Sequence, residues 1–185
     1  MYLIVGLGNP ESDYSNTRHN MGFNTINELA EEYKIDVNKN KFKGLYGSGI
    51  IEEKKVILLK PQTYMNLSGQ SIREVVDFYK IDINNLIVIY DDIDIEPGKI
   101  KIKKFGGSGT HNGMKSVVHE LRTDNFKRVR VGIGMPNDKS NLIEYVIGAI
   151  PEDDKGELKK GVVLAKNAAV EILKNGIDIA MNKFN

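Results

Sequence analysis

A histidine and a group of carboxylates follow two segments that have the composition of buried strands. His19 lies in TRHN, soon after the apolar run 2–8, and Asp91 lies at the end of the apolar run 86–92. Ligand sites in open α/β sheets gather beyond the carboxyl ends of the strands, so we expect these side chains to meet there. A carboxylate that holds one imidazole nitrogen leaves the other free to take a proton near neutral pH. A structural role for His19 stays open, and the pattern does not choose between Asp91 and its acidic neighbours Asp92, Asp94 and Glu96.

Three asparagines stand at expected junctions between elements. Asn9, Asn66 and Asn112 occur in GNP, MNLSG and HNGMK. A carboxamide both donates and accepts hydrogen bonds, so several together suit a substrate rich in amides or bases. Helix capping is the alternative role for Asn66 and Asn112, because asparagine is a favoured N-cap residue.

Several common catalytic and cofactor motifs are absent or incomplete. The chain has no cysteine, three histidines and no HExxH motif, so a zinc site would need carboxylates. GLGNPE is a weak match to a dinucleotide fingerprint, and GGSGT narrowly misses the serine nucleophile elbow. The acidic run YDDID lacks the glycine and distal glutamate of a calcium loop. We therefore expect no metal and no cofactor.

A near-neutral net charge conceals a basic segment. Residues 99–130 hold nine basic and two acidic side chains, a net charge of +7, which leaves −6 for the rest of the chain. Such a segment is either a solvated lysine-rich face or a surface for a polyanion. Alternation in KIKIK and RVRVG places Lys99, Lys101 and Lys103 on one strand face, and Arg128 and Arg130 on another. If these strands are neighbours, the sequence predicts two parallel basic rows.

These residues need a framework in which strands and helices interleave. Apolar or alternating runs predict strands over 2–8, 45–51, 55–60, 86–92, 99–103 and 128–134. Helical periodicity predicts a helix after Asn20, for which Asn20 is the expected N-cap, and further helices that begin near Asn66 and Asn112. The region 140–183 is predicted to be largely helical. The order of these elements favours an α/β fold, a single domain over residues 1–185 with a mixed β-sheet flanked by helices.

Size and hydropathy agree with this framework. A chain of 185 residues corresponds to about one domain and is long enough for a hydrophobic core. No apolar run approaches the roughly 20 residues of a membrane span, and the first residues lack the basic start of a signal peptide. We therefore expect a cytoplasmic protein that does not contact a membrane.

Taken together, four long motifs resemble bacterial peptidyl-tRNA hydrolases. They are GLGNPESDYSNTRHNMGF, KPQTYMNLSG, YDDIDIEPGKIKIKKFGGSGTHNGMKS and FKRVRVGIG, in the order and spacing of that family. The resemblance covers about residues 2–150. It implies an α/β domain with a twisted mixed β-sheet, and hydrolysis of the ester that joins a peptide to the 3′ ribose of tRNA, without a metal.

The resemblance also assigns roles to individual residues. His19 matches the catalytic base and Asp91 the carboxylate that supports it. Asn9 matches the residue that distinguishes a blocked aminoacyl group from a free one. The positions that match contacts to the tRNA end or the adjoining peptide are Tyr14, Tyr64, Asn66 and Asn112, and Met65 lines the same cleft. Lys103 and Arg130 match a basic clamp for the tRNA phosphate near the acceptor end.

Small departures from the family pattern leave this chemistry intact. Tyr64 stands where phenylalanine is common, and Thr110 where glycine is frequent.

The resemblance implies a mechanism in which His19 deprotonates a water that then attacks the ester. It also implies peptidyl-tRNA as the partner and a monomeric protein. Two other interpretations stay open: an RNA-binding relative without catalysis, and a hydrolase of small esters or amides.

Overall fold

The computed structural model describes residues 1–185 and contains one seven-stranded sheet of order β2-β3-β4-β1-β5-β7-β6. β1 pairs in parallel with β4 and β5, and β5 with β7, whereas β2, β3 and β6 pair antiparallel to their neighbours. The predicted mixed sheet is therefore confirmed. The strands are β1 (Tyr2–Gly6), β2 (Lys39–Lys41), β3 (Gly44–Ile51), β4 (Lys54–Pro61), β5 (Leu86–Asp92), β6 (Ile100–Lys103) and β7 (Lys127–Gly132).

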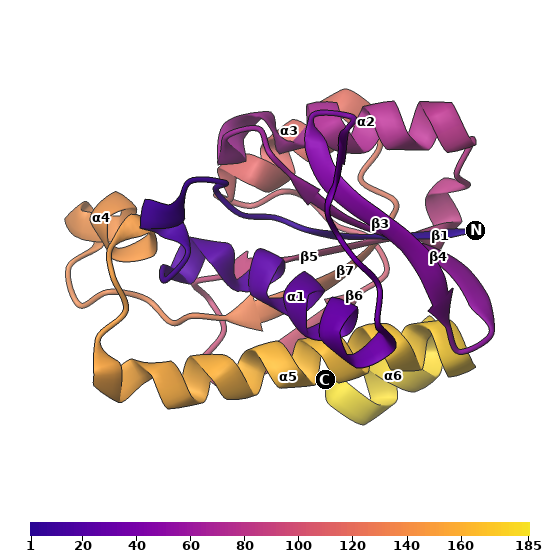
Figure 1. Ribbon diagram of the computed structural model, residues 1–185. Coiled ribbons are helices and arrows are strands. Elements are labelled where there is room, and N and C mark those ends of the chain that lie inside the picture. The colour runs from indigo at the N-terminus through magenta and orange to yellow at the C-terminus, as the bar shows by residue number, and fades with distance from the viewer.

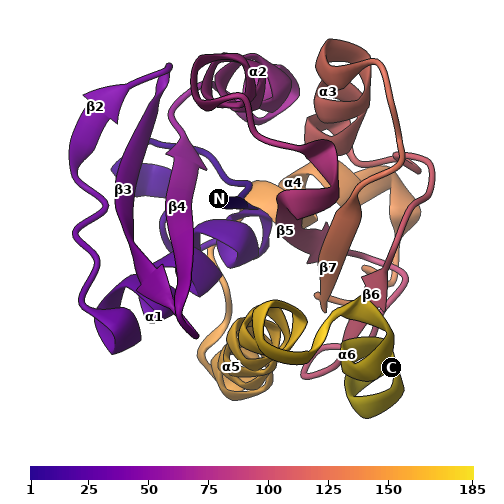
Figure 2. The ribbon, with the colours of Figure 1, turned by 90° about the vertical axis from the view of Figure 1, so that its right-hand side faces the viewer.

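Helices cover both faces of the sheet (Figures 1 and 2). α2 and α3 pack on one face, while α1 and α5 pack on the other. Two hydrophobic cores, one on each face, result from this arrangement. The helices are α1 (Met21–Tyr33), α2 (Ser68–Tyr79), α3 (Asn112–Leu121), α4 (Leu142–Ile147), α5 (Glu152–Asn175) and α6 (Ile177–Phe184). No helix is both long and apolar enough to cross a membrane.

The central strands are continuous apolar runs because both of their faces are covered. Leu3, Ile4 and Val5 of β1 are fully buried, and the apolar residues of β5 are buried to the same degree. β6 instead alternates: its isoleucines are buried and its lysines exposed. The hairpin of β3 and β4 is confirmed, and the short edge strand β2 extends it beyond the predicted elements.

A close approach of α1 to the sheet brings the segment before it over the ends of β1 and β5. A Cβ atom at Gly22 would lie 2.4 Å from both the Leu7 nitrogen and the Ile89 oxygen. Only glycine permits this contact. The 3₁₀ turn η2 (Arg18–Asn20) directly precedes α1, so His19 is held at the carboxyl edge of the sheet.

Candidate active site

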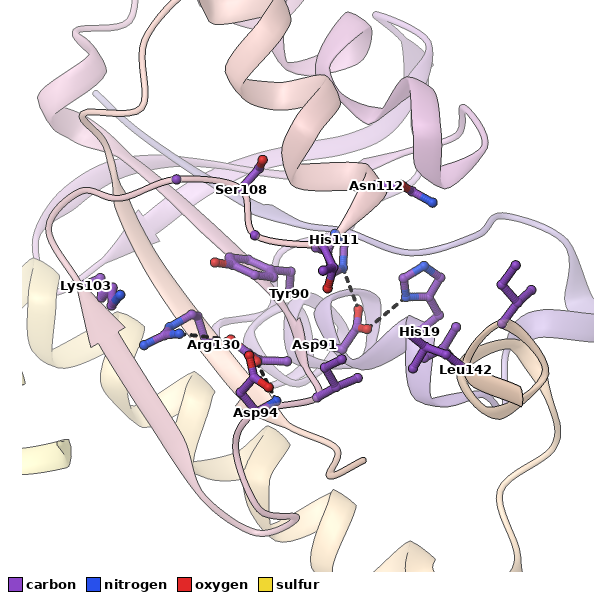
Figure 3. A pocket seen from close by; sticks show the side chains of 17 residues that line it. His19, Tyr90, Asp91, Asp94, Lys103, Ser108, His111, Asn112, Arg130 and Leu142 are labelled. Atoms are coloured by element: carbon purple, nitrogen blue, oxygen red, sulfur yellow. Dashed lines mark hydrogen bonds and ion pairs between the residues drawn. The ribbon is translucent and has the colours of Figure 1, made fainter. Parts of the chain in front are cut away.

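A cavity of about 340 Å³ opens at this edge (Figure 3). Its floor is the end of β5 and the two residues that follow it, from Tyr90 to Asp94, and His19 lies beside this floor. The glycine-rich loop 107–111 and the first residue of α3 form one wall, and α4 forms another. Each wall thus comes from a different part of the chain.

His19 and Asp91 meet at the cavity as predicted. The distance from His19 Nδ1 to Asp91 Oδ2 is 2.9 Å, and the Asp91 side chain is 2% exposed. An ionised carboxylate only accepts hydrogen bonds, so Nδ1 carries the proton of the neutral His19 ring. His19 Nε2 points away from Asp91 (Figure 3) and is free to accept a proton.

A second imidazole binds the same carboxylate. His111 Nε2 lies 3.0 Å from Asp91 Oδ1, and the two imidazole rings are 5.0 Å apart. Sequence reasoning did not assign His111 to the site. Its position directly before Asn112, at the start of a helix after a glycine-rich loop, was the available signal.

Backbone geometry separates the roles of the two histidines. His111 is the N-cap of α3, and its Nδ1 accepts a hydrogen bond from the Met114 backbone N–H at 3.2 Å. A ring nitrogen that accepts an N–H bond is unprotonated, so the proton of the neutral ring is on Nε2 and points to Asp91. Protonating His111 would break the cap. His19 is therefore the imidazole that can exchange a proton with the cavity.

The electrostatics of the cluster follow from burial and these hydrogen bonds. Burial raises the pKa of the Asp91 carboxyl, but the interactions with His19 and His111 lower it much further, so Asp91 stays ionised. Burial lowers the pKa of the His19 imidazole, yet the charge of Asp91 and the hydrogen bond to it outweigh burial and raise the pKa above its ordinary value.

The same three side chains have the composition of a metal site. Their ligand atoms lie within 4.8 Å of one another. A metal requires an unprotonated nitrogen lone pair, whereas the α3 cap places a proton on His111 Nε2. Both oxygens of Asp91 are already occupied by imidazoles. The arrangement does not fit a metal ion.

Asn9 presents its side chain in one defined orientation. Its Oδ1 accepts a hydrogen bond from the Met65 backbone N–H at 3.0 Å, which leaves the Nδ2 donor without a partner in the protein. The Asn20 carboxamide binds both the N–H and the carbonyl of Asn9, at 2.7 and 3.1 Å. Asn20 stands at the start of α1 but makes no capping bond, so its predicted capping role was wrong.

The chain is similar to known proteins over almost its whole length. The family model for peptidyl-tRNA hydrolase matches residues 3–185. The chain belongs to the peptidyl-tRNA hydrolase family. A relative in Clostridium botulinum strain Alaska E43, named peptidyl-tRNA hydrolase, is 55% identical over 185 residues, which cover 100% of this chain and 96% of that one. A peptidyl-tRNA hydrolase crystal structure from Acinetobacter baumannii superposes with a TM-score of 0.93 at 40% identity, covering 99% of this chain and 93% of the other.

Neither Asn66 nor Asn112 caps a helix, so both side chains are available for binding. Asn66 lies in the 3₁₀ turn η3 (Met65–Leu67), and α2 begins after it, with no side-chain cap. Asn112 is the first residue of α3, but His111 makes the capping bond. Both asparagine side chains are exposed and make no hydrogen bond within the protein.

The predicted site residues fall into two groups. His19, Asp91, Asn112, Lys103 and Arg130 line the cavity. The other five lie outside its lining, along η1 (Ser12–Tyr14), η3 and the segments beside them. The Tyr64 hydroxyl donates to Glu11 Oε1, and a Cβ at Gly113 would lie 2.6 Å from Met65 Sδ. The residues outside the lining are Asn9, Tyr14, Tyr64, Met65 and Asn66.

The two basic rows are adjacent, but they are not equivalent. β6 and β7 pair so that Lys101 faces Arg130 and Lys103 faces Arg128. Lys103 is exposed, whereas Arg130 forms an ion pair with Asp92 at 3.0 Å. Arg128 is 1% exposed and donates to the backbone carbonyls of Gly107, Asp124 and Phe126. The prediction that Arg128 lies on a basic surface was therefore wrong.

Proposed function

We propose that this member of the peptidyl-tRNA hydrolase family cleaves the ester between a peptide and the 3′ ribose of tRNA, with His19 as general base. The observation that carries the proposal is the 2.9 Å contact between His19 Nδ1 and the buried Asp91 carboxylate at the cavity. Family membership supports the substrate class.

The reaction needs an oriented water and a proton acceptor. His19 Nε2 removes a proton from the water as the water oxygen bonds to the ester carbonyl carbon. Asp91 fixes the His19 tautomer and stabilises the imidazolium that forms. When the bond from carbon to the ribose 3′ oxygen breaks, the imidazolium returns the proton to that oxygen. The products are a peptide carboxylic acid and free tRNA.

Amide donors are suited to the charge that develops on the ester oxygen. The Asn9 Nδ2 group has no partner in the protein, and the exposed carboxamides of Asn66 and Asn112 make no internal hydrogen bond. Donors that are already oriented stabilise an oxyanion without reorganisation during the reaction. We assign two roles to Asn9: it donates to the oxyanion, and it recognises the amide next to the ester.

The orientation of Asn9 supports a preference for blocked aminoacyl groups. With Oδ1 bound to the Met65 N–H, Asn9 offers the substrate a donor. An N-acyl group brings a carbonyl acceptor to that donor, whereas a free ammonium brings only donors. The free aminoacyl ester is therefore the poorer substrate.

The remaining residues are assigned to binding the ends of the substrate. Lys103 lines the cavity with a free ammonium group, and Arg130 lies beside it, so we place a phosphate near the tRNA acceptor end against this pair. The remaining side chains lie around η1 and η3 or at the start of α3, and we assign them to binding the tRNA end or the adjoining peptide. They are Tyr14, Tyr64, Met65, Asn66 and Asn112.

A gel assay of N-acetyl-aminoacyl-tRNA cleavage tests the proposal. The wild type should release free tRNA, and His19→Ala should lower kcat by about 10²–10⁴-fold, the usual contribution of a positioned general base. His119→Ala is the matched control, since His119 is exposed on α3. Tight binding without turnover would favour the RNA-binding alternative. Turnover of a short ester at the same rate as the tRNA substrate would favour the small-ester hydrolase.

A further inference from the structure

The α4 wall of the cavity reaches the hydrophobic core only through Tyr145 and Val146, which are partly buried. α4 contains six residues and none of them is buried, and Ile143 is 74% exposed. Nevertheless, Leu142, Ile143 and Val146 line the cavity, and Figure 3 shows Leu142 beside His19. A helix this short is not stable alone, so contacts elsewhere must hold the wall in place.

Arg18, the neighbour of His19 in the chain, contacts this segment and the start of α5. Its guanidinium lies 4.0 Å from the centre of the Tyr145 ring, and its Nη1 donates to the Tyr145 carbonyl at 3.4 Å. Its Nη2 forms an ion pair with Asp154 in the first turn of α5 at 2.9 Å. The Arg18 side chain is only 8% exposed. One arginine therefore joins α4 and α5 to the turn that carries the base.

Backbone contacts continue this connection on both sides. Thr17 forms an isolated β-bridge with Ala149, and the Ile150 N–H donates to the Asn16 carbonyl at 3.2 Å. The Tyr145 hydroxyl donates to the Ile133 carbonyl at 2.6 Å. Tyr145 is thus fixed at its ring by Arg18 and at its hydroxyl by the segment after β7.

We propose that Arg18 is a positioning residue that latches the α4 wall against the catalytic turn, and thereby sets how tightly the cavity holds substrate. The kinetic part of this proposal rests on the proposed hydrolase function. The α4 side chains that line the cavity, Leu142, Ile143 and Val146, are apolar and cannot take part in the proton transfer. We therefore expect them to contact the substrate in the ground state and in the transition state alike. Loss of such binding raises KM and leaves kcat nearly unchanged.

Hydrogen exchange of the free protein tests the latch without reference to activity. Arg18→Gln should speed exchange of amides 142–148 by roughly three- to thirtyfold, the effect of losing one cation–π contact and one partly exposed ion pair. Amides of β1 and β5 should keep their rates. Tyr145→Leu removes the other half of the stacking contact, together with the hydroxyl bond to Ile133, and should also speed exchange of amides 142–148. The effect of the double variant should be smaller than the sum of the two single effects, because both single changes remove the same cation–π contact.

Two further variants complete the design. Arg73→Gln is the matched control, because Arg73 also donates to a backbone carbonyl and pairs with a carboxylate, but on α2. It should leave amides 142–148 unchanged. Arg18→Lys keeps the charge opposite Asp154 but loses the planar stacking on Tyr145, so its exchange rate should lie between those of the wild type and Arg18→Gln.

Steady-state kinetics with N-acetyl-aminoacyl-tRNA then decide the positioning role. We expect KM to rise about threefold or more in Arg18→Gln and Tyr145→Leu, with kcat within about twofold of the wild type. Unchanged exchange of amides 142–148 in both variants would overturn the latch. Faster exchange with an unchanged KM, or a fall in kcat alone, would overturn the link to substrate binding. A wild type without turnover would instead refute the hydrolase function, and the exchange result would still decide the latch.

Discussion

His111 Nε2 lies 3.0 Å from Asp91 Oδ1, and its Nδ1 is bound to the first turn of α3. The Asp91 carboxylate is therefore fixed to a helix N-terminus on one side and to His19 on the other. A buried carboxylate with a single partner could rotate, whereas two donors on its two oxygens define its plane. This arrangement keeps the His19 ring in the orientation that directs Nε2 away from Asp91.

His111→Phe should therefore lower kcat by about tenfold, the approximate contribution of one hydrogen bond to a charged group. The effect should be smaller than that of His19→Ala, because the base itself remains. Single-turnover rates on N-acetyl-aminoacyl-tRNA measure it. Loss of activity equal to that of His19→Ala would mean that His111 itself exchanges the proton.

The pH dependence of kcat/KM should report the raised pKa of His19. Only the unprotonated imidazole is a base, so kcat/KM should increase with pH, with an inflection above the ordinary histidine value of about 6.5. In Asp91→Asn the charge that raises the pKa is gone while burial remains, so the inflection should move to lower pH and kcat should fall. Profiles of both proteins between pH 5 and 9 test this, and an unmoved inflection in Asp91→Asn would contradict the pairing.

Sequence patterns predicted the elements that depend on local periodicity. Burial on both faces made β1 and β5 apolar throughout, and one-sided burial made β6 alternate. The meeting of His19 with Asp91 followed from a general rule about strand ends. In contrast, β2 has three exposed residues and no apolar pattern that could have revealed it.

The parts that the sequence did not predict depend on contacts between distant segments. Asn20 has the right type and place for an N-cap, but its carboxamide binds the Asn9 backbone instead. Arg128 alternates with valines like an exposed strand residue, yet the loop 104–111 folds over it. His111 reaches Asp91 only because that loop returns to the end of β5. Local pattern carries no information on such partners.

Asn9→Asp should narrow the preference for blocked over free aminoacyl-tRNA. The aspartate can still accept the Met65 N–H, and its second oxygen then replaces the Nδ2 donor. A carboxylate oxygen attracts a free ammonium and repels an acyl carbonyl. The ratio of kcat/KM for N-acetyl-aminoacyl-tRNA and aminoacyl-tRNA measures the change. An unaltered ratio would remove Asn9 from this role.

Salt dependence should separate the two cations that line the cavity. Lys103→Ala should raise KM for the tRNA substrate and reduce the log–log salt slope by about 0.7–1, since one phosphate contact releases about that many counterions. Arg130 is already paired with Asp92, so Asp92→Asn should free it and lower KM. A minimal ester without the tRNA body should show neither effect. Parallel salt dependences in the wild type and Lys103→Ala would mean that this face is only solvated surface.

Arg128 should contribute to stability rather than to tRNA binding. Its guanidinium is buried without a carboxylate partner, and it is held by carbonyls that include Gly107 of the cavity wall and Asp124. Arg128→Met leaves these acceptors without their donor and should lower the free energy of unfolding by about 2–4 kcal/mol. Lys101→Met, an exposed change on the same sheet face, should alter it by less than about 0.5 kcal/mol.

Urea denaturation measures both stabilities, and KM at two salt concentrations completes the test for Arg128. The salt slope of Arg128→Met should equal that of the wild type, because a guanidinium enclosed by backbone carbonyls has no path to a phosphate. Loop 107–111 ends at His111, so a loosened loop should also lower kcat. A reduced salt slope with unchanged stability would instead make Arg128 a phosphate ligand and restore the second basic row to the tRNA surface.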